Sequence, residues 1–539
     1  MAIKQHWYEN AVFYEVSVRS FYDSNGDGIG DLKGLIEKLD YFTQLGVDCL
    51  WLLPIYASPL KDDGYDISDF CQIHSDLGSL QDFDELVSSA HQRGLRIIMD
   101  LVMNHTSADH TWFKTGRVDK RSPYHDYYVW SVDPKKYADA RIIFIDTETS
   151  NWTWNETTKE YYWHRFYSSQ PDLNYENPSV IEEMKRVIHF WLQKGIDGFR
   201  VDAVPYLVEQ EGTNCENLPK THAILQEIRR YVDEISQDKL LLCEANQWPN
   251  DVVEYFGDGK EFQMAFNFPI MPRMFMALKK ANAAPIRWAL EQLPQIPGGC
   301  QWGTFLRNHD ELTLEMVSPE ERTFMWENYS PDSRYRLNLG IRRRLSPLLE
   351  NDRRKLELMT ALLFSLPGSP FIYYGDEIGM GDNVELFDRN GLRTPMQWQS
   401  GPNAGFTNAE KAFIPLIADP LYKPESINVA AQINAPDSLW QFYHHLIKIF
   451  KENSQKVSQT FKWIETDHAE IAAFSRGDLP GQILVVANLS DKTLEFSTPS
   501  PGSKFTSAID LLTGKTFQIH SSTLSLPLPA YSCFWLSLY

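Results

Sequence analysis

Short apolar runs alternate with amphipathic helical patterns over most of this chain of 539 residues. Such an alternation is typical of parallel strand–helix units, in which each helix returns the chain to the start of the next strand. Eight such runs predict a closed (β/α)8 TIM barrel of the α/β class, whose chemistry lies at the carboxyl ends of the strands. The predicted strands span residues 12–18, 49–53, 96–101, 198–202, 240–244, 264–268, 304–308 and 371–374.

Two long segments interrupt the strand–helix rhythm. Residues 108–178 are aromatic and polar, and they predict a small inserted domain after the third strand. Residues 312–352 follow the seventh strand and are rich in arginine, and excursions of this length are usually functional lids or disordered. Because this segment keeps apolar residues such as Met325, Trp326 and Ile341, we predict an ordered lid whose arginines bridge to the acidic body of the protein.

The spacing of the apolar residues changes near the carboxyl end of the chain. A helical pattern at 439–450 gives way to short alternating runs separated by Gly, Pro and Asp, which are typical of antiparallel strands. We therefore predict a barrel formed by residues 1–107 and 179–456 and a C-terminal β-sandwich domain over residues 457–539. The runs lie at 461–464, 471–474, 482–487 and 534–538.

The composition narrows the choice of partner. Lys and Arg number 51 against 72 Asp and Glu, which gives a net charge of −21. An acidic surface argues against nucleic acid and anionic membranes as partners and suits a small neutral substrate. No apolar run is long enough to span a membrane, and the amino terminus lacks the pattern of a signal peptide. The six cysteines are scattered, which favours reduced thiols, so we expect a cytoplasmic protein.

Charged residues gather at the ends of three predicted strands. Arg200 and Asp202 are two residues apart and so share one face of the fourth strand, a pattern that a structural ion pair would also produce. The fifth strand ends at Glu244, and the seventh leads into His309 and Asp310. Ionisation of three carboxyls at one barrel mouth would bring three negative charges close together, which is unfavourable in free energy. At least one of the three should therefore have a raised pKa. An ionised and a protonated carboxyl about 5–5.5 Å apart are what retaining glycoside cleavage requires.

Four segments, at 100–105, 198–202, 244 and 309–310, resemble the sequence regions of the α-amylase family (glycoside hydrolase family 13). The resemblance implies that Asp202 is the nucleophile, that Glu244 is the general acid and base, and that Asp310 binds sugar hydroxyls and stabilises the transition state. It also implies that Arg393 pairs with Asp62 and that Tyr65 stacks on the sugar. The substrate-binding residues implied in this way are Asp62, Tyr65, His105, Gln170, Arg200, His309, Glu311 and Arg393.

The lid and the segments around it show a closer resemblance within that family. Segments 307–313, 325–327, 338–345, 351–353 and 388–391 resemble the trehalose synthases, which isomerise maltose. This implies an intramolecular transglucosylation of maltose to trehalose by a retaining double displacement, with minor hydrolysis to glucose. Maltose and trehalose are then the expected small-molecule partners, and a homodimer is left open. The alternatives are an α-glucosidase or oligo-1,6-glucosidase, another disaccharide isomerase of the family, or an inactive carbohydrate-binding paralogue.

Oxygen-bearing residues at alternate positions of 23–31 resemble the first half of a Ca²⁺ loop. An EF-hand needs a glutamate at the position that Gly34 occupies, so this loop is not an EF-hand. It is either a loop that binds one ion or a turn without metal. Mg²⁺ is a second candidate ion for this loop. The ligands would be Asp23, Asn25, Asp27, the Ile29 carbonyl and Asp31.

The family resemblance implies a second Ca²⁺ site, which would pin the inserted domain to the barrel. Its ligands would be Asn104, Asp172, Glu209 and the carbonyls of Tyr206 and Leu207. We expect both ions to be structural, and we expect no organic cofactor.

Overall fold

The computed structural model describes residues 6–454, 460–479, 481–499 and 505–539. Eight parallel strands close into a barrel in the order β1-β15-β12-β11-β10-β9-β5-β2, so the strands follow the chain around the barrel. This confirms the predicted α/β barrel. The strands are β1 (Phe13–Val16), β2 (Cys49–Leu52), β5 (Arg96–Leu101), β9 (Gly198–Val201), β10 (Leu240–Cys243), β11 (Met264–Phe266), β12 (Gln301–Phe305) and β15 (Ser369–Tyr373).

The seventh strand differs in position from the prediction. It was predicted at 304–308, whereas β12 begins at Gln301 and ends at Phe305. The ladders to β11 and β15 set this register, because Gln301 pairs with Met264 and Phe305 with Phe371. The residues that follow, including Asp310, therefore lie beyond the strand end, in the loop over the barrel mouth.

The helices of the barrel begin at residues whose side chains suit a helix start. Helix α4 has a capping box at Ser79 and Asp82, and Asn177 caps α6 with Pro178 in the first position. The helix predicted at 439–450 is α15. The α-helices are α1 (Val18–Phe21), α2 (Leu32–Glu37), α3 (Leu39–Leu45), α4 (Leu80–Gln92), α5 (Thr111–Gly116), α6 (Pro178–Gln193), α7 (Pro219–Ile235), α8 (Pro249–Val252), α9 (Ile270–Lys280), α10 (Ala284–Glu291), α11 (Pro319–Tyr329), α12 (Leu345–Leu348), α13 (Arg353–Ser365), α14 (Val429–Gln432) and α15 (Leu439–Ser454).

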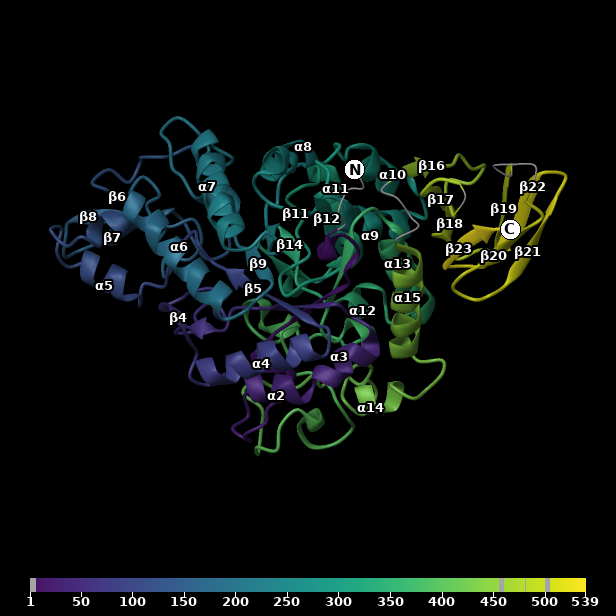
Figure 1. Ribbon diagram of the computed structural model, residues 1–539, viewed down its shortest axis with the longest axis horizontal. Coiled ribbons are helices and arrows are strands. Elements are labelled where there is room, and N and C mark those ends of the chain that lie inside the picture. The colour runs from purple at the N-terminus through teal and green to yellow at the C-terminus, as the bar shows by residue number, and fades with distance from the viewer. Residues whose placement is uncertain (1–5, 455–459, 480, 500–504) are drawn as a thin grey trace.

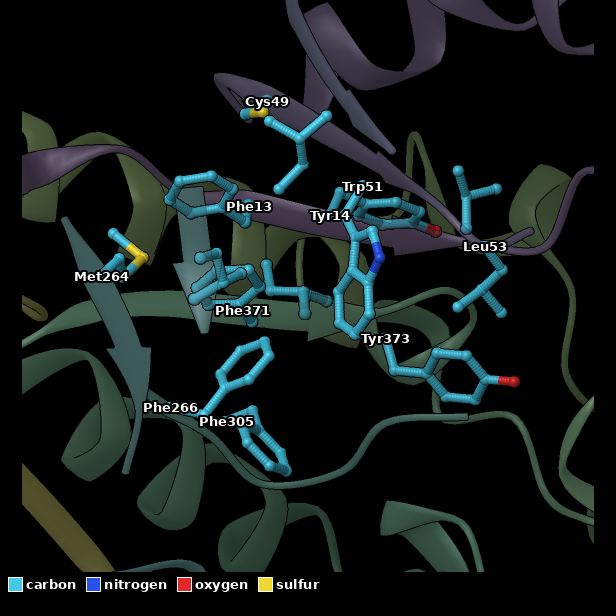
Figure 2. Packing of buried hydrophobic residues seen from close by; sticks show 14 of the residues in the cluster. Phe13, Tyr14, Cys49, Trp51, Leu53, Met264, Phe266, Phe305, Phe371 and Tyr373 are labelled. Atoms are coloured by element: carbon cyan, nitrogen blue, oxygen red, sulfur yellow. The ribbon is translucent and has the colours of Figure 1, made fainter. Parts of the chain in front are cut away.

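Aromatic side chains fill the interior of the barrel (Figure 2). Phe13 and Phe371 stack with ring centroids 4.3 Å apart, and Phe266 lies 4.9 Å from Phe371 and 5.2 Å from Phe305. Rings of this size bury a large apolar area and leave little freedom of position. The packed interior is a rigid floor beneath the residues at the carboxyl ends of the strands.

The two interruptions of the barrel are both ordered. The segment after β5 carries a three-stranded sheet of β6 (Trp130–Ser131), β7 (Trp152–Asn155) and β8 (Glu160–Trp163), at the opposite end of the molecule from the C-terminal strands (Figure 1). The segment after β12 contains α11, the hairpin β13 (Arg336–Leu337) and β14 (Gly340–Ile341), and α12. A further hairpin, β3 (Tyr56–Ala57) and β4 (Asp69–Ile73), follows β2.

The lid arginines hold this segment to the barrel in two ways. Arg343 pairs with Asp382 at 2.9 Å, as predicted for a bridge to the acidic body. Arg342 and Arg344 instead donate to backbone carbonyls, of Leu386 at 2.7 Å and of Tyr374 at 2.7 Å. These contacts explain why a segment so rich in charge is ordered.

The C-terminal region is an antiparallel sheet in the order β16-β17-β18-β23-β20-β21-β22-β19, as the change of period predicts. The sequence did not reveal β19 to β22, because these strands are polar on one face and several are short. The strands are β16 (Phe461–Trp463), β17 (Ile471–Arg476), β18 (Ile483–Asn488), β19 (Leu494–Pro499), β20 (Ser507–Asp510), β21 (Thr516–His520), β22 (Thr523–Leu528) and β23 (Ser532–Leu538).

Cys49, Cys71, Cys215, Cys243 and Cys533 are free thiols, and Cys49, Cys215, Cys243 and Cys300 are buried, as expected for core residues outside a disulfide framework. In the described part of the chain, no helix is both long enough and apolar enough to cross a membrane.

Candidate active site

The three predicted catalytic carboxyls line one cavity at the carboxyl end of the barrel. Asp202 follows β9, Glu244 follows β10, and Asp310 lies in the loop after β12. The cavity has a volume of about 140 Å³, roughly ten times the space that one water molecule needs. The other predicted site residues that line it are Asp62, Tyr65, His105, Glu311 and Arg393.

Arg200 lies behind the cavity wall and joins the central carboxyls. Its Nη1 is 2.7 Å from Asp202 Oδ1, and the same guanidinium pairs with Glu244 and Asp100. The side chain is 1% exposed, so all three interactions act with little solvent screening. The sequence did not assign a role to Asp100, which the parallel ladder between β5 and β9 places opposite Arg200.

The two central carboxyls differ in pKa. Burial raises the pKa of Glu244 to about 7, against the lowering effect of Arg200. Burial also raises the pKa of Asp202, again against Arg200, but only to about 6. Between these values Asp202 is largely ionised while Glu244 largely keeps its proton, which is the division that a nucleophile and a general acid require.

Asp310 is held as an anion by the cations around it. Burial alone would raise its pKa, but His309 and Arg389 lower that pKa well below its usual range. His309 is the counterpart, since burial opposes protonation but Asp310 and Glu15 raise the pKa of His309 to about 9. Glu15, on β1, was not predicted as a site residue; it is 1% exposed and pairs with His309 Nδ1.

Two side chains on the cavity wall are arranged to receive a sugar. The Tyr65 ring stacks on His309 with centroids 5.4 Å apart, and its hydroxyl lies 2.8 Å from His309 Nε2. Burial lowers the pKa of His105 to about 4, so this imidazole is neutral near pH 7. Its Nε2 is buried and has no hydrogen-bond partner in the described structure, which leaves it free for a sugar hydroxyl.

The predicted ion pair between Arg393 and Asp62 is wrong. Arg393 lies 3.2 Å from Asp63 and 2.9 Å from Asp310, while Asp62 accepts a hydrogen bond from Gln170 Nε2 at 2.8 Å. Asp63 has a left-handed backbone, with φ +47°, which turns its carboxylate towards Arg393 and leaves Asp62 on the cavity wall. Gln170, like Arg200 and His309, supports the residues of the wall from behind.

The sequence assigned no individual role to several side chains of the site. Arg389 lies 2.9 Å from Asp310 and 2.8 Å from Glu311. From the inserted segment, Arg141 reaches Glu315 of the lid at 2.9 Å. These pairs join positions far apart in the chain, so no local pattern indicates them. Other wall residues are Phe144, Phe166, Tyr206 and Asn246.

The second predicted metal site passes a test of fit. Asn104 Oδ1, Asp172 Oδ2 and Glu209 Oε1 are all buried without a hydrogen-bond partner in the described structure. Burial raises the pKa of Asp172 to about 8. Burial also raises the pKa of Glu209 well above its usual range, and the nearby negative charge of Asp172 raises it further. Buried oxygens without donors are what a hard cation such as Ca²⁺ satisfies.

The loop at 23–31 has suitable oxygen atoms, but its own backbone already satisfies them. Asp23 accepts hydrogen bonds from the N–H groups of Asn25, Gly26 and Gly28, and Asp31 accepts from Gly34. Across the described ranges, no group of three or more His, Cys, Asp and Glu side chains is arranged to hold a metal ion. The Asp172 set is not such a group, because it consists of two carboxyls and the amide of Asn104.

The chain is similar to known proteins over most of its length. Residues 15–459 match the model of the α-amylase catalytic domain, and residues 461–535 match that of the maltogenic amylase C-terminal domain. The chain is 54% identical over 493 residues to the trehalose synthase/amylase TreS of Mycobacterium tuberculosis, which covers 90% of this chain and 82% of the relative. It is 53% identical over 500 residues to the trehalose synthase of Pimelobacter sp., with 90% of this chain and 87% of the relative covered.

Among solved structures, a trehalulose synthase MutB mutant in complex with Tris superposes with a TM-score of 0.80 at 29% sequence identity. The match covers 99% of this chain and 100% of that one. The matched catalytic domain spans most of the chain, and the predicted catalytic carboxyls meet in one cavity at the mouth of its barrel. The chain therefore belongs to the α-amylase family.

Proposed function

We propose that the protein isomerises maltose to trehalose by transferring glucose within the closed active site. The observation that carries this proposal is that Asp202, Glu244 and Asp310 meet in one cavity, to whose wall the inserted segment and the lid both contribute. Relatives that share more than half of its residues over most of its length are trehalose synthases, which supports the same reaction here.

The reaction proceeds by two displacements. Asp202 attacks the anomeric carbon of the non-reducing glucose of maltose, while Glu244 gives its proton to the departing glycosidic oxygen. The freed glucose turns inside the cavity, and its anomeric hydroxyl attacks the glucosyl ester as Glu244 takes that hydroxyl proton back. Asp202 is released as a carboxylate. Two inversions keep the donor glucose in the α configuration, and attack by the anomeric hydroxyl of the freed α-glucose gives the α,α-1,1 linkage of trehalose.

Exclusion of water decides between isomerisation and hydrolysis, because water competes with the freed glucose for the ester. The inserted segment meets the lid where Arg141 pairs with Glu315 and where the Asn338 N–H donates to Asp146 at 2.7 Å. Tyr167 also donates to Asp388 at 2.9 Å. These contacts hold the inserted segment against the segments that line the cavity, which limits the entry of water, so hydrolysis to glucose is a minor reaction.

The metal sites and the cellular location belong to the same proposal. A Ca²⁺ ion held by Asn104, Asp172 and Glu209 would stabilise the junction of the inserted segment and the barrel; its role is structural. The loop at 23–31 is the second candidate site, for Ca²⁺ or Mg²⁺. The free thiols of Cys49, Cys71, Cys215, Cys243 and Cys533 support a reducing compartment such as the cytoplasm.

Incubation with maltose followed by carbon NMR tests the proposal. We expect a 1,1-linked disaccharide as the main product and glucose as the minor one. Glucose alone, with no trehalose at any time, would instead support an α-glucosidase or oligo-1,6-glucosidase. Asp202→Asn should abolish turnover and keep the fold, and activity in this variant would contradict the assigned nucleophile.

A further inference from the structure

A chain of alternating charges runs outward from Asp310 to a residue that the proposed mechanism does not use. Arg393 Nη2 lies 2.9 Å from Asp310 Oδ1, and Arg393 Nη1 lies 3.2 Å from Asp63 Oδ2. The other carboxylate oxygen of Asp63 lies 2.6 Å from Arg19 Nη1. The charges from Arg19 to Asp310 are therefore plus, minus, plus and minus.

Arg393 needs a second anion because another cation shares Asp310. Arg389 Nε also lies 2.9 Å from Asp310 Oδ1, so two guanidinium groups approach one oxygen atom. Like charges at this separation repel, and Arg393 is only 4% exposed, so solvent screens the repulsion poorly. The carboxylate of Asp63 offsets this repulsion and holds Arg393 beside Asp310.

Asp63 is in turn held by Arg19. Its left-handed backbone, with φ +47°, is strained for a residue with a side chain and persists where surrounding contacts maintain it. The guanidinium carbon of Arg19 lies 4.3 Å from the centroid of the Phe413 ring, which fixes the arginine from its other side. The Phe413 N–H donates to the Gly28 carbonyl at 2.8 Å, so this support is anchored in the loop at 23–31.

We propose that Arg19 is a positioning residue that keeps Arg393 on Asp310 through Asp63. Arg19 does not line the active-site cavity; it lines a small cavity behind Tyr65, together with Asp63 and Arg393. Without Arg19, Asp63 draws Arg393 towards itself and away from Asp310. Asp310 then binds the sugar less firmly in the transition state, so kcat falls more than KM changes.

This inference rests on the proposed function only in the choice of substrate, because both isomerisation and hydrolysis need the same first displacement. The test therefore follows maltose isomerisation and the hydrolysis of an aryl α-glucoside in parallel. A native protein that hydrolyses the aryl glucoside but makes no trehalose contradicts the proposed isomerase. The role of Arg19 is then judged on the aryl glucoside.

Arg19→Gln should lower kcat by about 10²-fold, the effect of a small misplacement at a reacting centre, and should change KM little. Arg19→Lys should recover part of the loss, because lysine restores the charge but not the planar fork that stacks on Phe413. Arg93→Gln is the matched control: Arg93 pairs with Asp40 at 2.6 Å on the surface, and kcat should not change.

Asp63→Asn removes the carboxylate between Arg19 and Arg393, and asparagine tolerates the left-handed backbone at this position. The double variant Arg19→Gln with Asp63→Asn should lose little more kcat than either single variant. Circular dichroism and the melting temperature identify variants that fold. A folded Arg19→Gln protein with native kcat overturns the proposal, and so do losses that add in the double variant. If Arg19→Gln does not fold, native kcat in folded Asp63→Asn overturns it equally.

Discussion

At the scale of single residues, Arg200 decides how many protons the central carboxyls keep. One guanidinium pairs with Asp100, Asp202 and Glu244, whose side chains are 0%, 10% and 18% exposed. Three ionised carboxylates around one cation would leave an excess of negative charge in a poorly screened site. One proton is therefore retained near neutral pH, and Glu244, with the higher pKa of the two catalytic carboxyls, holds it.

The pH dependence of kcat/KM for maltose should be bell-shaped, with limbs near pH 6 and pH 7. As the pH falls through about 6, Asp202 gains a proton and is lost as a nucleophile. As the pH rises through about 7, Glu244 loses its proton and is lost as an acid. Because the two groups interact, the limbs belong to the pair. Rates measured across this range, corrected for stability, provide the check.

Glu244→Gln separates the two limbs, because glutamine has no proton to lose in this range. With maltose, whose leaving group needs the acid, the rate should fall by about 10²–10⁴-fold. The first displacement of an aryl α-glucoside with a good leaving group, measured as a burst, should continue and lose the alkaline limb. A native profile that stays flat through pH 7, or an alkaline limb that persists in the variant, would contradict the assignment of Glu244.

At the scale of elements, the junction between the inserted segment and the barrel depends on a few residues after β5. His105 forms an isolated antiparallel bridge with Asp172, and Tyr128 forms another with Leu173. Asn104 Oδ1, Asp172 Oδ2 and Glu209 Oε1 lie at this junction without hydrogen-bond donors from the described chain. Polar atoms left in this state are costly, so the junction should depend on a bound cation.

Removal of divalent ions should therefore lower the melting temperature, and added Ca²⁺ should restore it. An ion present at 100 times its dissociation constant stabilises the fold by about 2.7 kcal/mol. Differential scanning calorimetry with and without a chelator measures this effect. Asp172→Asn should remove most of the response, whereas Asp23→Asn tests the loop at 23–31. An unchanged melting temperature after chelation would contradict both metal sites.

At the scale of the whole molecule, the C-terminal sheet supports the barrel from outside the active site. Trp535 of β23 is 3% exposed and belongs to the same buried cluster as Phe364 of α13. Arg476 of β17 donates to the carbonyl of Ser365, the last residue of α13, at 2.6 Å. In the described structure, the residues that line the active-site cavity all come from the barrel and its insertions. The sheet therefore contributes stability and no catalytic group.

Trp535→Ala should lower the free energy of unfolding by about 3–5 kcal/mol, the cost of removing a buried aromatic side chain. At a temperature where the variant stays folded, kcat should equal that of the native protein. Denaturant unfolding and kinetics on one sample check both expectations. Trp154→Ala is the control, because Trp154 is 43% exposed and its loss should cost little. A Trp535→Ala protein with native stability, or a folded Trp535→Ala protein without activity, would contradict the conclusion that the sheet contributes stability and no catalytic group.

The sequence by itself predicted the barrel and the three carboxyls at its mouth, to which the family resemblance assigns catalytic roles. Both depend on local patterns: an apolar run predicts a strand, and the residue at its carboxyl end reaches the mouth whatever the details of packing. For the same reason, the position of Asp202, Glu244 and Asp310 at the barrel mouth could be predicted without knowing how the neighbouring segments pack. An error of three residues in the start of β12 did not alter the placement of Asp310 at the mouth.

Tertiary structure alone decided which charges meet. Glu15 and His309 are 294 positions apart, and the choice of Arg393 between Asp62 and Asp63 depends on one left-handed residue. Such contacts arise from strand register and loop packing, which no local pattern contains, because the energy of an ion pair depends on distance in space and on burial. The pKa values of Asp202 and Glu244, and so the proposed division of roles between them, are consequences of that packing.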